Sequence, residues 1–125
     1  MALIAVVEDN TSNMKLITDV LVRADYEVLQ ACDADTGIPL IRERLPDLVI
    51  MDMHMPGTDG LSATRLLKAD PLTKHIPIIA LTARAMEGDR EMIMAAGCDE
   101  YASKPVRYKD VLRMVERIIN EKNYA

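Results

Sequence analysis

The sequence alternates between short apolar runs of strand length and segments whose apolar residues recur with the period of a helix. The strand-like runs lie at residues 2–7, 27–31, 47–51, 76–81 and 100–103. The first, third and fourth runs are almost continuously apolar, which is typical of strands buried on both faces of a parallel sheet. Because parallel crossovers are right-handed, this alternation predicts an α/β fold, a doubly wound (βα)5 sheet with helices on both faces. The common strand order for such a chain is 2-1-3-4-5.

Four segments carry mostly apolar residues at helical spacing. These residues are Met14, Ile17, Leu21 and Ala24; Ile38, Ile41 and Leu45; Leu61, Thr64 and Leu67; and Val111, Val115 and Ile118. The segment 86–96 has a weaker pattern that ends at Gly97. Pro39 fits the second helix only if that helix begins near Asp35, because proline is tolerated in the first turn or just beyond it and disrupts a helix interior.

The composition is typical of one globular domain. Composition and apolar patterning together argue against a nucleic-acid partner and against a membrane span. The 125 residues carry a formal net charge of −5 and include no Phe or Trp. An acidic chain without aromatic stacking platforms is a poor binder of nucleic acid, so we expect none to be bound. No run is long enough to span a membrane, and the opening run is too short and wrongly flanked for a signal peptide. We therefore expect residues 1–125 to form a single cytoplasmic domain with no effector domain.

The two cysteines, Cys32 and Cys98, stand far apart and form no CxxC pair. In a cytoplasmic protein this spacing predicts reduced thiols rather than a disulfide. We expect both thiols to be buried.

Acidic residues follow two strands that the expected order makes neighbours. Glu8 and Asp9 follow the run 2–7, and Asp52 follows the run 47–51. In open α/β sheets, ligands bind beyond the carboxyl ends of the strands where the order reverses, which here is between these two strands. Carboxylates so close together raise one another's pKa values unless a cation lies between them. Mg²⁺ favours one or two carboxylates with water and phosphate oxygens, and it fits this set of ligands.

Two further polar residues reach the same edge of the predicted sheet. Thr82 follows the run 76–81, and Lys104 follows the run 100–103. A carboxylate, a metal site, a hydroxyl donor and an ammonium are the groups needed to receive a phosphoryl group and to stabilise the charge on its oxygens. The residues at this edge therefore indicate phosphoryl-transfer chemistry.

Each of these residues also has a purely structural interpretation. Glu8 and Asp9 can favour the positive end of a helix dipole. Asp52 can be a turn residue, Thr82 a helix cap and Lys104 a solvated loop residue. These interpretations explain the residues singly but not their convergence.

Four segments, in chain order, resemble the motifs of the receiver domains of two-component response regulators: VVEDN, VIMDMHMPGTDG, ALTA and YASKP. The segments NTSNMKL and ARAMEGDRE…AAGCDEY are similar to those of DivK-type single-domain regulators and of receivers attached to hybrid histidine kinases. The resemblance covers the whole chain. It implies the flavodoxin/CheY-like form of the predicted fold and a phosphorylation-dependent switch, with cell-cycle or division control as the role of the DivK type.

The resemblance also implies a role for each residue of the site. Asp52 would be the phosphoacceptor that attacks a phosphohistidine of a partner kinase, and Lys104 would pair with the phosphoryl group. Asp9 and Asp52 would bind Mg²⁺ directly, and Glu8 would bind it through water. The backbone carbonyl of His54 would complete the ligand set, and Mn²⁺ could replace Mg²⁺.

A second group of residues would carry the switch. The hydroxyl of Thr82 and the backbone N–H of Ala83 would bind phosphoryl oxygens, and a cis peptide bond would precede Pro105. When Thr82 moves inward, Tyr101 would rotate into the space that it leaves.

The implied partners are a sensor or hybrid histidine kinase, a histidine phosphotransferase and a downstream protein. The downstream protein would bind the face formed by the fourth helix, fifth strand and fifth helix, which includes Arg84, Arg107 and Tyr108. The domain would be a monomer or weak dimer and not an enzyme, apart from slow self-dephosphorylation by a water that passes His54 and Arg84.

Two other functions of α/β domains each require a motif that this sequence lacks. A phosphohydrolase of the haloacid dehalogenase kind needs a second Asp two positions after its nucleophile, where this chain has His54. A dinucleotide-binding domain would show GxGxxG after the first strand, where this chain has EDNTSN. The nearer alternatives are a detached receiver of a hybrid-kinase phosphorelay and a receiver-like interaction module that works without phosphorylation. Such a module would lack at least one site residue, and none is missing.

Overall fold

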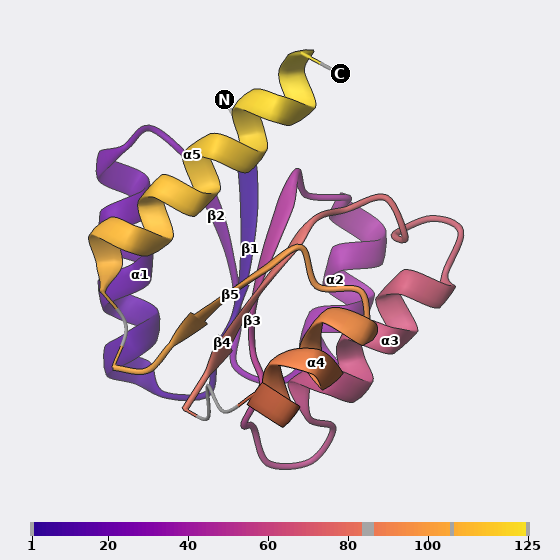
Figure 1. Ribbon diagram of the computed structural model, residues 1–125. Helices are drawn as coiled ribbons and strands as arrows, with labels where there is room; N and C mark the ends of the chain where they lie inside the picture. The colour runs from indigo at the N-terminus through magenta and orange to yellow at the C-terminus, as the bar shows by residue number, and fades with distance from the viewer. Residues whose placement is uncertain (1, 84–86, 106, 125) are drawn as a thin grey trace.

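The computed structural model describes residues 2–83, 87–105 and 107–124, which form a five-stranded parallel sheet between two layers of helices (Figure 1). The strands are β1 (Leu3–Val7), β2 (Glu27–Ala31), β3 (Leu48–Asp52), β4 (Ile78–Thr82) and β5 (Glu100–Ser103). They pair in the order β2-β1-β3-β4-β5, and every pair is parallel. The predicted fold class and strand order are confirmed.

The helices connect and flank these strands. They are α1 (Thr11–Arg23), α2 (Ala34–Arg44), α3 (Gly60–Ala69), α4 (Glu87–Ala95) and α5 (Tyr108–Tyr124). In Figure 1, α1 and α5 cover one face of the sheet, and α2, α3 and α4 cover the other. Met86, which the sequence places in the fourth helix, lies outside the described residues. No helix in the described part of the chain combines the length and the apolar character that a membrane span requires.

The core consists of two apolar layers, one on each face of the sheet. Successive residues of β1 point to opposite faces, as the strand pleat requires. Ile4 and Val6 belong to the layer under α1 and α5, whereas Ala5 and Val7 belong to the layer under the other helices. All four side chains are buried, so β1 is covered on both faces, as its continuous apolar character predicts.

Side-chain caps define the first residues of three helices. Asn10, Asp33 and Asp59 precede α1, α2 and α3, and each accepts a hydrogen bond from the backbone N–H three residues later. Pro39 is therefore the sixth residue of α2, just beyond its first turn, where the sequence requires it to lie.

Two strands extend one residue beyond their apolar runs, as far as a polar residue. β3 extends through Asp52 and β4 extends through Thr82, so both side chains belong to strands rather than to the loops that follow. β4 begins only at Ile78, because Pro77 has no N–H to donate to a neighbouring strand.

The prediction of two buried thiols is wrong for Cys32. Cys98 is 4% exposed, and burial raises the pKa of its thiol to about 11. Cys32 is exposed because it follows β2, which is an edge strand of the sheet. The described structure places neither thiol in a disulfide.

Candidate functional site

Three carboxylates converge at the carboxyl ends of β1 and β3. Glu8 and Asp9 follow β1, and Asp52 is the last residue of β3, the neighbouring strand. One carboxylate oxygen from each residue lies within 4.8 Å of the others. Glu8 and Asp52 are 1% and 0% exposed, whereas Asp9 is exposed to solvent. The strand order thus brings together three side chains that are distant in the sequence.

Lys104 brings a positive charge to the two buried carboxylates. Its Nζ lies 3.0 Å from Oδ1 of Asp52 and 3.6 Å from Oε1 of Glu8. The backbone N–H of Lys104 donates to the carbonyl of Thr82 at 2.7 Å, which fixes the start of the loop after β5. The peptide bond between Lys104 and Pro105 is cis, as the resemblance implies.

The two buried carboxyl groups differ in their affinity for a proton. Burial and the neighbouring Asp52 carboxylate raise the pKa of Glu8 to about 7, although the Lys104 ammonium opposes the rise. Burial also disfavours ionisation of Asp52, but the Glu8 carboxyl, the His54 backbone N–H and Lys104 outweigh it and lower the pKa of Asp52. At neutral pH the site therefore holds an ionised Asp52 beside a Glu8 that readily takes up a proton.

Three buried oxygen atoms of the site lack a hydrogen-bond partner among the described residues. They are Oε1 and Oε2 of Glu8 and Oδ2 of Asp52. A buried carboxylate oxygen is costly without a partner, and oxygen-only ligands suit a hard divalent cation. Together with the exposed carboxylate of Asp9, these atoms fit a site for such a cation.

Thr82 and His54 form a contact that the sequence did not suggest. Nε2 of His54 lies 3.0 Å from Oγ1 of Thr82, and the backbone N–H of His54 donates to Oδ1 of Asp52 at 3.0 Å. The resemblance implies roles for the His54 backbone carbonyl and for His54 beside the path of a water. Nothing in the spacing of these residues shows that the ends of β3 and β4 bring the His54 ring to Thr82. Ala83 directly follows β4 and is exposed, next to this contact.

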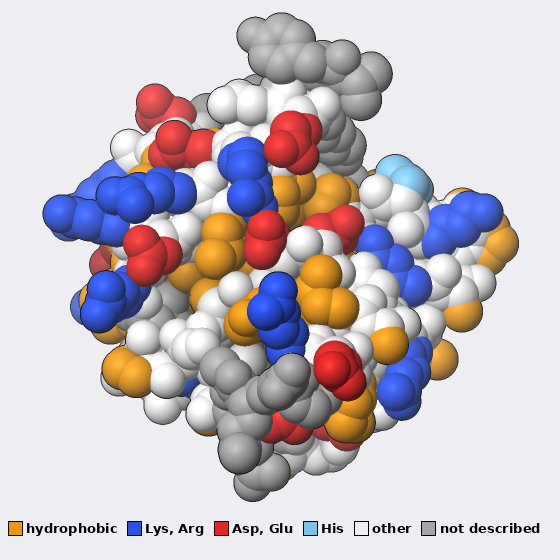
Figure 2. All heavy atoms as spheres, in the orientation of Figure 1, with side chains coloured by type: hydrophobic (Ala, Val, Ile, Leu, Met, Phe, Trp, Pro, Cys, Tyr) orange, Lys and Arg blue, Asp and Glu red, His pale blue; other side chains and the backbone are white. Residues whose placement is uncertain are grey.

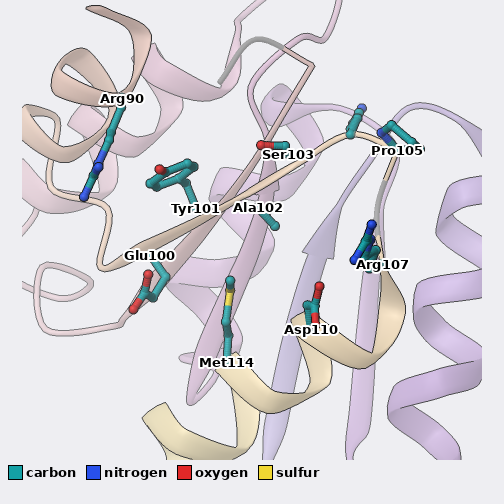
Figure 3. Close-up of a pocket in the computed structure, with 10 residues that line it drawn as sticks. Arg90, Glu100, Tyr101, Ala102, Ser103, Pro105, Arg107, Asp110 and Met114 are labelled. Carbon is teal, nitrogen blue, oxygen red and sulfur yellow. The ribbon is translucent and has the colours of Figure 1, made fainter. Parts of the chain in front are cut away.

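Tyr101 lies half-buried in β5, on a second surface of the molecule. The guanidinium of Arg90 lies 5.5 Å from the centre of its ring, within the range of a cation–π contact. A groove of about 590 Å³ runs beside the ring between α4 and α5 (Figure 3). Tyr101, Ser103, Arg107, Asp110 and Met114 are among the residues that line it.

Comparison with known proteins identifies the family. A model of the response regulator receiver domain matches residues 4–116. This chain belongs to the receiver domain family. The receiver is 43% identical over 115 residues to the polar-differentiation response regulator DivK of Brucella anthropi, a match that covers 92% of this chain and 91% of that protein. DivK of Brucella ovis matches to the same extent.

Solved structures of other receivers share the fold. The receiver domain of the sensor histidine kinase PA1611 from Pseudomonas aeruginosa PAO1 is 35% identical, with a TM-score of 0.87 over 95% of this chain and 98% of that chain. That structure holds a magnesium ion in its active-site cleft. A response regulator receiver domain protein from Clostridium thermocellum is 30% identical, with a TM-score of 0.90 over 99% and 98% of the two chains.

The family assignment confirms the expectation of a two-component response regulator receiver of DivK-like and CheY-like form. It does not by itself assign roles to the residues of this receiver. Of the residues that the resemblance implicates, Arg84 lies outside the described residues. The structure brings Glu8, Asp9, Asp52 and Lys104 into one cluster, and it links Thr82 to that cluster through His54.

Proposed function

We propose that this receiver accepts a phosphoryl group on Asp52 from a phosphohistidine of a sensor or hybrid histidine kinase, or of a histidine phosphotransferase. One observation carries the proposal: Asp52 is a buried carboxylate with an ammonium 3.0 Å away and two further carboxyl groups beside it. Burial of several ionisable groups together is costly, and such clusters are typical of functional sites.

The proposed reaction transfers one phosphoryl group between the two proteins. An oxygen of the Asp52 carboxylate attacks phosphorus, and the P–N bond to the partner's imidazole breaks. The electron pair of that bond stays on the imidazole nitrogen, which takes up a proton from water, and Asp52 becomes an acyl phosphate. Lys104, which already pairs with Asp52, follows the negative charge onto the phosphoryl oxygens.

A divalent cation completes the proposed site. Asp9 and Asp52 would hold Mg²⁺ directly, Glu8 would hold it through water, and the backbone carbonyl of His54 would add a ligand. The unpartnered buried oxygens of Glu8 and Asp52 support this assignment, and Mn²⁺ has suitable chemistry to replace Mg²⁺. The bound cation supplies charge neutralisation at the phosphoryl oxygens.

Phosphorylation would become a signal through Thr82, Ala83 and Tyr101. The Thr82 hydroxyl and the Ala83 N–H would donate to phosphoryl oxygens, and Tyr101 would turn inward as Thr82 moves. Hydrogen bonds to a charged group are worth about 1.5–3 kcal/mol, and about 1.4 kcal/mol changes an equilibrium tenfold, so one such bond can change which state dominates.

The proposed output is a contact with a downstream protein at the groove between α4 and α5, which Arg107 helps to line. Tyr108, the first residue of α5, lies beside it in the sequence. The surrounding face mixes Lys, Arg, Asp and Glu side chains with apolar ones, which is a composition suited to a protein partner (Figure 2). We propose that the chain acts in the cytoplasm, where kinases make phosphohistidine from ATP, and that it is a monomer or weak dimer.

Slow hydrolysis would end the signal. A water molecule attacks phosphorus, the bond from phosphorus to the Asp52 oxygen breaks, and inorganic phosphate leaves the regenerated carboxylate. The position of His54 beside both Asp52 and Thr82 supports its assignment to the path of this water.

Incubation with acetyl phosphate and Mg²⁺, followed by intact-mass measurement, tests the proposal. The wild type should gain one phosphoryl group, and Asp52→Asn should gain none. Asp19→Asn, which alters an exposed acid of α1, should be labelled like the wild type. Equal labelling of Asp52→Asn would place the chemistry elsewhere, and no labelling of the wild type would favour an interaction module that works without phosphorylation.

A further inference from the structure

His54 joins the Asp52 carboxylate to the Thr82 hydroxyl in the described structure. It follows β3 by two positions, and Thr82 ends β4, the strand that pairs with β3. Its backbone N–H donates to Oδ1 of Asp52, and its ring nitrogen Nε2 lies 3.0 Å from the Thr82 hydroxyl oxygen. The backbone and the side chain of one residue thus contact two groups of the proposed switch.

The contact between His54 and Thr82 lies on the α4 side of the strand ends. Both side chains line a cavity of about 200 Å³, whose other walls include Asp59, Met92 and Ile93. None of the acidic residues at the ends of β1 and β3 lines this cavity, and neither does Lys104. The Thr82 hydroxyl therefore contacts His54 beside a cavity on the α4 side of the strand ends.

The Thr82 hydroxyl contacts His54 and not Oδ2 of Asp52. Oδ2 of Asp52 has no hydrogen-bond partner in the described part of the chain, so Thr82 does not donate to it here. The His54 ring can accept from the hydroxyl or donate to it, depending on its tautomer. In either tautomer, the hydrogen bond between Thr82 and His54 competes with one from the hydroxyl to a group on Asp52.

We propose that the His54 imidazole is a positioning residue that holds Thr82 in the resting state and opposes its closure onto a phosphoryl group. The inference rests on the proposed function, because it concerns the equilibrium between two positions of the same switch hydroxyl. His54 sets how readily the unphosphorylated receiver adopts the active arrangement, and its removal makes that arrangement easier to reach.

Beryllofluoride, a non-covalent mimic of a phosphoryl group on aspartate, provides the test, at saturating Mg²⁺. His54→Phe keeps a ring of similar size and removes the nitrogen, and it should lower the apparent Kd for beryllofluoride about three- to tenfold. His54→Gln carries an amide at a similar reach and should stay closer to the wild type. His75→Phe, the matched change at the other, exposed histidine, should have no effect.

Two further measurements separate positioning from a general effect on structure. In His54→Phe, the ¹³C shift of the Thr82 methyl group in the free protein should move toward its value in the beryllofluoride complex. In a Thr82→Ala background, His54→Phe should no longer change the Kd, because its effect acts through the hydroxyl. If His54→Phe is poorly folded, His54→Ala serves in the same cycle.

An unchanged or raised Kd in His54→Phe and in His54→Ala would overturn the inference while leaving the proposed function intact. So would a lowered Kd that persists in the Thr82→Ala background. Failure of the wild type to bind beryllofluoride, or equal binding by Asp52→Asn, would overturn the proposed function together with the inference.

Discussion

At the scale of single residues, the site places two buried carboxyl groups beside one ammonium group. Glu8 and Asp52 are almost wholly removed from water, which alone would favour their neutral forms. Lys104 lies close enough to both to offset much of that cost. The offset is unequal, since Asp52 is nearer to the ammonium and also accepts a backbone N–H. Asp52 is therefore the carboxyl group of the pair that more readily stays ionised.

Lys104→Met tests the ammonium directly. The Met side chain keeps most of the apolar stem of lysine and removes the charge, so the phosphoryl oxygens lose one charged hydrogen bond. We expect labelling of Asp52 by acetyl phosphate to slow about 10- to 100-fold, since such a bond contributes about 1.5–3 kcal/mol. Time courses of intact mass measure the rate. Lys74→Met, at an exposed position, should label at the wild-type rate, and a similar loss in both variants would count against a specific role for Lys104.

Glu8→Gln tests the raised pKa of Glu8 through the pH dependence of stability without metal. The folded protein holds a proton on Glu8 up to a pH of about 7, whereas the unfolded chain releases it near 4.5. Between these values the folded state binds more protons, so the free energy of unfolding falls as pH rises. Relative to Glu8→Gln, the wild type should lose at most about 3 kcal/mol from pH 4.5 to 8.

Urea denaturation in EDTA at several pH values measures this difference. The Asp52 carboxyl does not produce it, because its pKa is lowered and its proton is released below this pH window. Parallel curves for the wild type and Glu8→Gln would show that Glu8 titrates as it does in water.

At the scale of elements, the site depends on how closely α3 approaches the end of β3. A Cβ atom on Gly60, the first residue of α3, would lie 2.1 Å from the carbonyl oxygen of Asp52 and 2.7 Å from Cα of Met53. Both neighbours are backbone atoms, which cannot turn aside as a side chain can. Only glycine therefore permits this packing of α3 against the end of β3.

Gly60→Ala should shift α3 away from β3 and displace Asp52. We expect the free energy of unfolding to fall by about 2 kcal/mol or more and Asp52 labelling to slow, because overpacking forces the backbone to move. Urea denaturation and intact mass check the two effects. Gly57→Asn is the control, since Gly57 has a φ of +78° in open space and asparagine tolerates that conformation. An equally stable Gly60→Ala would contradict the close approach.

Pro39→Ala should stabilise the protein. Pro39 is exposed and lies in the second turn of α2, where it has no N–H to donate to the carbonyl four residues earlier. Alanine restores that donor and has the higher helix propensity, so we expect a gain of roughly 1–3 kcal/mol. A lower urea midpoint for Pro39→Ala than for the wild type would show that contacts of the proline ring stabilise the fold more than the restored backbone hydrogen bond does.

At the scale of the whole molecule, the strand order decides which side chains meet. β1 and β3 are neighbours although β2 and two helices separate them along the chain. A ligand bound at their ends would join two segments that are distant in the sequence, so a bound cation would stabilise the fold as a whole rather than one loop.

Mg²⁺ should therefore raise the free energy of unfolding by an amount set by its own affinity. At a free concentration of 100 times Kd, we expect a gain of about 2.7 kcal/mol for the wild type. Asp9→Asn should lose most of this gain without loss of core packing, because Asp9 is exposed. Urea denaturation with and without Mg²⁺ measures the effect. Equal gains for the wild type, Asp9→Asn and Asp52→Asn would place the cation elsewhere.

The sequence alone determined the fold class, the strand order and the membership of the carboxylate cluster. Continuous apolar runs mark strands buried on both faces, and the ends of parallel strands share one edge of the sheet, so Glu8, Asp52 and Lys104 could be assigned to one place from local pattern and topology. Only the tertiary structure decided how the side chains lie within that place. The bond between His54 and Thr82, the exposure of Cys32 and the unequal proton affinities of Glu8 and Asp52 depend on distances and burial between segments that are far apart in the chain. Such distances follow from packing in three dimensions, which no local periodicity encodes.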